Sequence, residues 1–224
     1  MDHLSPFQKL SVYFVPFFMS VVFHEFAHGL VASMFGDNTA KEQGRLTLNP
    51  LPHVDVMGTL VLPVIMMLSG TNLLFGWAKP VPINPGKFSR YRAGLFWVSF
   101  AGPLMNFLLA FLSGIALCLV ARFMPEDSFL LEPLLWMTKI SIYLNFGIGF
   151  FNMLPLPPLD GSKMIEAFLS YNATQKFEQI QRFSMVILIV LIMSGALSFL
   201  FYPINFFSNL TLSICGRIFG IPLV

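Results

Sequence analysis

The chain has 224 residues, of which 56% are hydrophobic and only 11% are charged, and its formal net charge is +2. Soluble globular domains carry about 25% charged residues, so this composition excludes an ordinary soluble domain and indicates a membrane protein. The small net charge and the lack of a basic block argue against nucleic acid as a partner and favour the lipid bilayer. Cys118 and Cys215 both lie in apolar sequence and predict neither a disulfide framework nor a CxxC metal site.

The first apolar run extends from about Leu10 to Phe35, which is long enough for a helix to cross a bilayer. We expect a retained span rather than a signal peptide, because no short apolar core ends in a small-residue cleavage site. The second half of this run contains HEFAH, which places His24, Glu25 and His28 in apolar sequence. Ionisable residues at membrane depth are costly, so this cluster is by default a functional hypothesis.

A polar stretch from residue 36 to residue 55 follows the first run. Within it, GRLTLNP (44–50) has alternating residues bounded by Gly and Asn-Pro, and it predicts a short strand or hairpin. The second apolar run, Val56 to Phe75, is interrupted by two glycines and a proline. We expect this run to be re-entrant, because broken helices are tolerated where protein buries them, and a plain span is the alternative.

Three further apolar runs cover residues 93–120, 134–154 and 184–201, and the apolar tail 203–224 is either a last span or an interfacial helix. No internal repeat and no second domain is evident. The sequence therefore predicts one all-α polytopic membrane domain over residues 1–224, with about five or six membrane segments and a short β-hairpin or re-entrant element. Its core covers about 10–170, and additional helices cover about 176–224.

Charge bias orients the predicted segments. Basic residues precede the third run and follow the fourth: Lys79, Lys87, Arg90, Arg92, Lys163, Lys176 and Arg182. Acidic residues separate these two runs: Glu126, Asp127 and Glu132. Because cytoplasmic loops are enriched in Lys and Arg, we expect both basic loops in the cytoplasm and the acidic loop outside. The LDG sequence at the end of the fourth run then lies near the cytoplasm, at a depth similar to that of His28.

The HEFAH sequence predicts a metal site, because residues four apart share one face of a helix. Two imidazoles on that face can bind one ion, and Glu25 beside the first can act as a general base. A catalytic zinc site takes a third protein ligand. Asp160 is the leading candidate, because three prolines unwind the backbone just before it. The alternative for Asp160 is an N-cap of the following helix, and the presence of HEFAH favours the ligand.

Three more polar residues are candidates for contact with the site or with a substrate. Asn152 lies about two helical turns before Asp160 and can offer an N–H to substrate, or it can bond the broken backbone near Pro155. Asn106, one turn after a Gly-Pro pair, is expected to pack between helices, with a role in the site as the alternative. His53 either lies near the site, where it supports a ligand, contacts substrate or occludes the metal, or it stabilises a turn at the membrane interface.

These motifs resemble those of the site-2 proteases, which are intramembrane zinc metalloproteases. HEFAHG, GRLTLNPLPHVDVMGT, FGWAKPVPINP, AGPLMN and NMLPLPPLDG occur in order and cover most of residues 23–163. The resemblance is closest to the short bacterial or archaeal forms without a PDZ or CBS domain. It implies a catalytic core of three helices, one Zn²⁺ per chain bound by His24, His28 and Asp160, and Glu25 as the general base.

The resemblance also implies the reaction, which is cleavage of a transmembrane substrate protein near the cytoplasmic end of its helix, in the cell membrane. The GRLTLNP segment is then a candidate strand for holding an unwound substrate by β-augmentation. Two alternatives belong to other classes: a membrane metal-ion transporter, and a non-catalytic membrane chaperone built on the same fold. Glu25 argues against both, because neither needs a general base between two ligand histidines.

Overall fold

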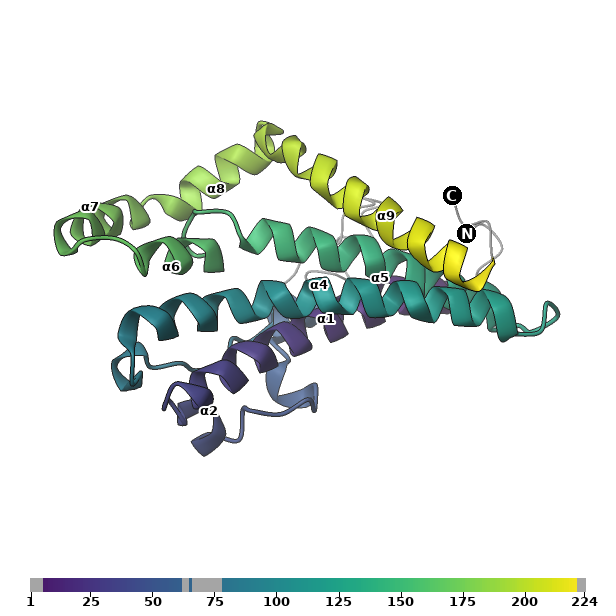
Figure 1. The fold of residues 1–224 in the computed structure, drawn as a ribbon, viewed down its shortest axis with the longest axis horizontal. Coiled ribbons are helices and arrows are strands. Elements are labelled where there is room, and N and C mark those ends of the chain that lie inside the picture. The colour runs from purple at the N-terminus through teal and green to yellow at the C-terminus, as the bar shows by residue number, and fades with distance from the viewer. Residues whose placement is uncertain (1–5, 62–64, 66–77, 221–224) are drawn as a thin grey trace.

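The computed structural model describes residues 6–61, 65 and 78–220, and no β-strand occurs in these ranges. The chain is all-α and polytopic, as the composition predicts. Its helices, in order, are α1 (Pro6–Met34), α2 (Thr39–Glu42), η1 (Leu51–His53), η2 (Val56–Val61), η3 (Pro85–Lys87), α4 (Tyr91–Phe123), α5 (Leu131–Asn152), α6 (Asp160–Glu166), α7 (Tyr171–Gln181), α8 (Ser184–Met193), η4 (Ala196–Leu200) and α9 (Phe201–Phe219) (Figure 1).

Within the described ranges, four helical segments are long and apolar enough to cross a membrane: 11–34, 91–123, 131–152 and 196–219. The long helices α1, α4 and α5 pack side by side, and α9 lies along α4 and α5. The loops before α4, together with α2, α6 and α7, gather at one end of this bundle, and the start of α1 and the end of α9 lie at the other end (Figure 1). The basic loops before α4 and after α5 therefore share one end, as the charge bias predicts.

The C-terminal part differs from the expected pair of segments at 184–201 and 203–224. The helix α8 ends at Met193, and Gly195 adopts a left-handed conformation with φ of 72°. The following helical segment then continues without a break through η4 and α9 to Phe219. The break between the two segments thus falls at Gly195 rather than near residue 202, because the glycine turn lies inside the fifth apolar run. Most of the second expected run, 56–75, lies outside the described residues.

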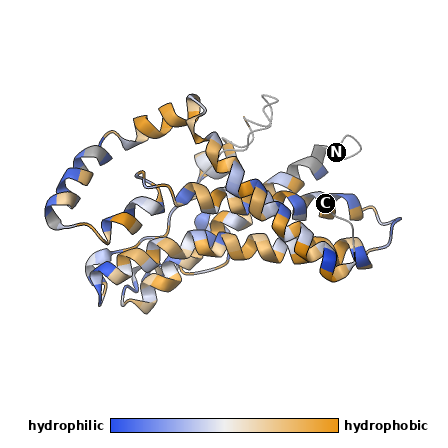
Figure 2. Cartoon of the chain, turned by 45° about the horizontal axis from the view of Figure 1, so that its top comes forward, coloured by the Kyte–Doolittle hydropathy of each residue, from blue (hydrophilic) through white to orange (hydrophobic). Residues whose placement is uncertain are grey.

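Hydrophobic residues make up most of the length of the long helices (Figure 2), and many of them are exposed on the outside of the bundle. Inside, α4, α5 and α9 meet in a cluster of Ala110, Leu117, Ile142, Phe146 and Leu212. On the outer side of α4, Trp97, Leu104, Leu108 and Leu112 are exposed. This arrangement suits a bilayer, because lipid tails are as apolar as these side chains and do not force them inward.

The strand predicted at residues 44–50 is wrong: this segment forms a turn and bends. The backbone N–H groups of Arg45 and Leu46 both donate to Ala40 O, which ties the segment to the end of α2. Thr47 Oγ1 accepts from the N–H of Asn49, whose own side chain accepts from the N–H of Leu51. Such local side-chain bonds compete with the ladder of a sheet, and they explain why alternation alone misled the prediction.

A segment at residues 78–84, without helix or strand, passes alongside α1 before α4 begins. Its backbone is anchored at both ends: the Lys79 N–H donates to His53 O, and the Asn84 N–H donates to the Asp37 carboxylate. Between these points, Arg45 Nη2 donates to the carbonyls of Lys79 and Pro80 at 2.9 and 3.2 Å. Four contacts from distant positions therefore hold this segment in place beside α1.

Candidate metal centre

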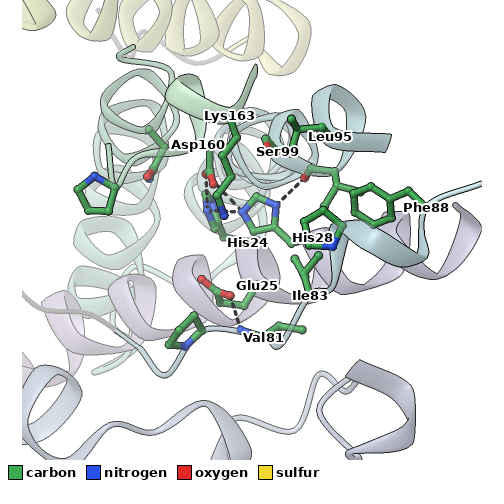
Figure 3. Close-up of a pocket in the computed structure, with 15 residues that line it drawn as sticks. His24, Glu25, His28, Val81, Ile83, Phe88, Leu95, Ser99, Asp160 and Lys163 are labelled. Atoms are coloured by element: carbon green, nitrogen blue, oxygen red, sulfur yellow. Dashed lines mark hydrogen bonds and ion pairs between the residues drawn. The ribbon is translucent and has the colours of Figure 1, made fainter. Parts of the chain in front are cut away.

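Three donor atoms converge between α1 and the start of α6 (Figure 3). His24 Nε2 and His28 Nε2 lie 3.0 Å apart, and Asp160 Oδ2 lies 3.1 and 3.3 Å from them. The two histidines are 6% exposed. The structure thus brings together the three residues that the sequence nominated as ligands, and they form a group able to hold a metal ion.

Asp160 reaches this position because of how the chain turns after α5. The helix α5 ends at Asn152, and α6 starts at Asp160 itself, with Leu159 as the N-cap residue and no side-chain capping bond. The alternative reading of Asp160 as an N-cap is therefore wrong. A Cβ at Gly161 would overlap the carbonyl oxygens of Met153 and Leu154. Glycine at this position lets α6 fold back against the end of α5, which directs Asp160 toward the histidines.

The outer nitrogens of both histidines are committed to oxygen acceptors. His24 Nδ1 lies 2.6 Å from Asn106 Oδ1, and His28 Nδ1 lies 2.6 Å from the Val98 carbonyl. Asn106 is oriented in turn, because its Nδ2 donates to Asn145 Oδ1 and to the carbonyl of Ser20. Each Nδ1 therefore carries the proton, and a neutral imidazole then presents a bare lone pair at Nε2.

Two imidazole lone pairs and one carboxylate oxygen thus face one another. Asp160 Oδ2 is buried, and it accepts no hydrogen bond from the described residues. Acceptor atoms at such distances repel unless a cation lies among them. Imidazole nitrogen and carboxylate oxygen are ligands of catalytic zinc, and bonds of about 2.1 Å in tetrahedral geometry give ligand edges of about 3.4 Å. The donor types and separations therefore fit a zinc ion.

Gly102 in α4 allows the close approach of a third helix to this group. A Cβ built at Gly102 would lie 2.5 Å from His24 Cε1 and 2.5 Å from His28 Nε2. The AGPLMN motif therefore serves the site at two positions, with Gly102 against both rings and Asn106 bonded to His24. Asn106 also packs fully buried between helices, as predicted, while a role in the site stays a prediction that its contact with His24 supports. The importance of Gly102 was missed, since no local pattern reports what faces a glycine.

Glu25 projects from α1 into the same cavity as the three converging residues, and this cavity has a volume of about 210 Å³. Its Oε2 accepts a hydrogen bond from the Val81 N–H at 2.8 Å, in the 78–84 segment (Figure 3). Both polar and apolar residues line the cavity. Besides these four residues, the polar ones include Ser99, Asn152 and Lys163, and the apolar ones include Val81, Ile83, Phe88 and Leu95.

The two remaining candidates, Asn152 and His53, differ in whether they line the cavity. Asn152 lines the cavity, and its Nδ2 donates to the carbonyl of Ile148 one turn earlier rather than to backbone near Pro155. His53 is fully buried but belongs neither to the converging group nor to the residues that line the cavity. Its Nε2 lies 2.9 Å from the Thr47 carbonyl, so the structure supports the turn-stabilising role.

Asp37 was not singled out from the sequence, yet it fixes the loop next to the site. This 1% exposed carboxylate accepts hydrogen bonds from Thr39 and from the Asn84 N–H at the end of the 78–84 segment. Burial alone would raise the pKa of the Asp37 carboxyl, but these hydrogen bonds and the charge of Lys87 outweigh it and lower the pKa. The Asp-x-Thr spacing signals a local turn, whereas the bond to Asn84 has no local signal.

Comparison with known proteins adds independent information. A profile described as Peptidase family M50 matches residues 127–195. "Putative zinc metalloprotease YwhC" of Bacillus subtilis is 36% identical over 199 residues, which cover 88% of this chain and 87% of that protein. "Putative zinc metalloprotease Rip2" of Mycobacterium tuberculosis is 30% identical over 187 residues, which cover 83% and 68%. No solved structure matches the chain at a comparable level of significance.

The similarity to YwhC extends over nearly the whole of both chains. The match to the family profile covers all of α5 and all of α6, where Asp160 lies. The chain therefore belongs to peptidase family M50, the family of the site-2 proteases.

Proposed function

We propose that the chain is an intramembrane zinc metalloprotease that cleaves peptide bonds within or next to the transmembrane helices of membrane proteins. The observation that carries the proposal is the convergence of His24 Nε2, His28 Nε2 and Asp160 Oδ2, with both Nδ1 atoms engaged elsewhere and Glu25 in the same cavity. Relatives named as zinc metalloproteases support it.

In this proposal His24, His28 and Asp160 hold one Zn²⁺ ion. When bound, the ion supplies a Lewis acid for the scissile carbonyl and lowers the pKa of a bound water. Glu25 accepts a proton from the attacking water, whose oxygen adds to the carbonyl carbon. Glu25 then returns the proton to the amide nitrogen as the C–N bond breaks, which yields a carboxylic acid and an amine.

The remaining lining residues bind the substrate. Ile83, Phe88 and Leu95 offer an apolar surface to an unwound transmembrane segment. Asn152 faces the cavity, and we assign it to contact with the substrate backbone. The basic loops lie at the same end of the bundle, so we place the cavity toward the cytoplasmic side of the cell membrane.

Reconstitution with a single-span reporter tests the proposal. Purified protein in liposomes is assayed for cleavage of the reporter, for bound zinc and for zinc uptake. Wild type should cleave and bind one zinc ion. Glu25→Gln should retain zinc and lose about 10²–10⁴-fold in rate, because the general base is removed.

The same experiment separates the alternatives. Cleavage by Glu25→Gln at the wild-type rate would contradict the mechanism. Zinc uptake without cleavage by wild type would favour a transporter. A wild-type protein that binds the reporter but neither cleaves it nor moves zinc would favour a chaperone.

A further inference from the structure

The carboxylate of Glu25 is held on one side only. Its Oε2 accepts the hydrogen bond from the Val81 N–H at 2.8 Å, and no described residue donates to Oε1. Glu25 has three side-chain torsions, so an unrestrained carboxylate would sample many orientations in a cavity of this size. A hydrogen bond to an ionised oxygen is stronger than a neutral one, and here it fixes one oxygen while the other stays available.

The sequence of the 78–84 segment favours donation by the Val81 N–H to Glu25. Pro80 and Pro82, on either side of Val81, have no N–H and hold the backbone in an extended form. The N–H groups of Lys79 and Asn84 donate to His53 O and to Asp37, away from Glu25. The Val81 N–H is therefore the donor that this segment directs at α1.

The distance between this donor and α1 is set by packing. Val81 is 6% exposed, and a Cβ built at Gly29 would lie 3.0 Å from Val81 Cγ1. Gly29 lies four residues after Glu25, so it is on the same face of α1. A glycine there lets the Val81 side chain rest against the helix, which brings the Val81 N–H within bonding distance of the carboxylate.

We propose that the Val81 backbone N–H is a positioning group for the general base. It fixes Oε2 of Glu25 so that Oε1 faces the cavity and takes the proton of the attacking water. This inference rests on the proposed protease function. It also explains why a Pro-Val-Pro sequence lies next to a catalytic glutamate: the prolines restrict the segment, and the single amide between them does the positioning.

Two substitutions at Val81 distinguish positioning from packing. Val81→Pro removes the N–H, retains most of the side-chain volume, and suits an extended segment already flanked by prolines. Val81→Ala keeps the N–H but deletes more of the side chain. If the Val81 N–H positions Glu25, kcat should fall about 10-fold or more in Val81→Pro, because a misplaced general base loses part of its rate enhancement. In Val81→Ala, which keeps the N–H, kcat should fall less. KM for the reporter and bound zinc should change less than twofold in Val81→Pro, within about 0.4 kcal/mol.

A second measurement does not depend on activity or on metal. In metal-free protein, amide hydrogen exchange at Val81 should be slow in wild type and at least tenfold faster in Glu25→Ala, because the acceptor is lost. Val81 is the one exchangeable backbone amide between Pro80 and Pro82, so a peptide fragment that begins at Lys79 or Pro80 and ends at Pro82 reports it directly. This measurement decides the matter if Val81→Pro fails to fold.

The outcomes are distinguishable from failure of the proposed function. If wild type cleaves and Glu25→Gln does not, the protease function stands. Equal kcat in Val81→Pro and wild type, a larger loss in Val81→Ala than in Val81→Pro, or unchanged Val81 exchange in Glu25→Ala would then each overturn the positioning role.

Discussion

At His24 and His28, the protonation of the outer nitrogens determines what the inner nitrogens can bind. Asn106 and the Val98 carbonyl accept from Nδ1, which leaves both Nε2 lone pairs directed at Asp160. For His24 this arrangement extends through Asn106 to Asn145, whose Nδ2 donates to Ser141. A chain of buried, satisfied polar groups of this kind is rigid, because each unmade bond would be costly away from water. The orientation of the His24 and His28 rings therefore depends on uncharged neighbouring groups.

Replacing Asn106 with alanine should weaken zinc binding by about 10–100-fold, because the acceptor that orients the His24 ring is lost. Competition with a chelator of known affinity measures this change. Asn209→Ala is a matched control, since Asn209 is an exposed residue of α9 whose side chain accepts from the Tyr143 hydroxyl and takes no part in the hydrogen bonds from His24 through Asn106 to Asn145. Equal zinc affinity in Asn106→Ala and wild type would contradict the assigned role.

Gly102→Ala should lower the bound zinc well below one ion per chain, because the new methyl group would lie 2.5 Å from atoms of both histidine rings. Metal analysis of purified protein measures it. Gly147→Ala in α5 is the control, since a Cβ there meets its nearest neighbour, Ile204 Cδ1, at 3.9 Å, an ordinary contact. If Gly102→Ala retains full zinc, α4 does not constrain the rings.

At the scale of elements, the site depends on how α6 and the 78–84 segment are held against α1. The helix α6 has only seven residues and owes its position to the turn after α5. The 78–84 segment has no internal hydrogen-bonded structure and owes its position to Arg45, His53 and Asp37. Neither element would adopt its place alone, because isolated short segments are not stable in themselves.

Gly161→Ala should abolish zinc binding while the long helices remain folded, because its methyl group overlaps two carbonyl oxygens and pushes Asp160 away from the histidines. Circular dichroism and metal analysis together report this. Gly195→Ala offers a contrast: φ is 72° and nothing lies within 4 Å of its Cβ, so it should cost about 1–2 kcal/mol of stability and leave zinc bound. Loss of zinc in both variants would indicate general unfolding instead.

Asp37 makes the loops beside the site sensitive to acid. Its pKa is lower in the folded than in the unfolded protein, so its stabilising contribution is present above the unfolded value of about 3.9 and is lost as the pH falls through the folded value. Thermal unfolding should therefore show stability declining below about pH 4, with a smaller decline in Asp37→Asn. An identical pH dependence in the two proteins would exclude Asp37 as a cause.

At the scale of the whole molecule, the bundle is apolar both inside and on its outer surface, and many of its hydrophilic residues lie at its two ends (Figure 2) and around one cavity. The converging donors lie on α1 and α6, while α4 closes the site through Gly102 and Asn106. The basic loops share the end of the bundle at which α6 lies. Charge bias therefore predicts which side of the membrane this end faces.

Labelling of introduced cysteines tests that orientation. With Cys118 and Cys215 replaced by alanine, Asp127→Cys in the loop after α4 should react with an impermeant maleimide on intact cells. Asn172→Cys in α7 should react only after lysis. Both positions are exposed, so access to the reagent depends on the membrane rather than on burial. The reverse pattern would invert the predicted topology.

The sequence by itself determined the features that depend on neighbouring residues. Apolar runs predict spans, and an i, i+4 spacing places His24 and His28 on one face of α1. Charge bias and the prolines before Asp160 supported the prediction that it lies beside them, which the geometry matches; its role as a ligand stays a prediction. The candidate strand at 44–50 failed, because local side-chain bonds there outweigh the alternating pattern.

Only the tertiary structure decided which groups surround these residues. Asn106 is 82 residues from His24, and Val81 is 56 residues from Glu25, so no local pattern could pair them. The close approach at Gly102 and the anchoring of the 78–84 segment likewise arise from packing between distant segments. The kinds of donor atom at His24, His28 and Asp160 can be read from the sequence. The orientation of the two histidine rings and of Glu25 depends on contacts that exist only once the helices have assembled.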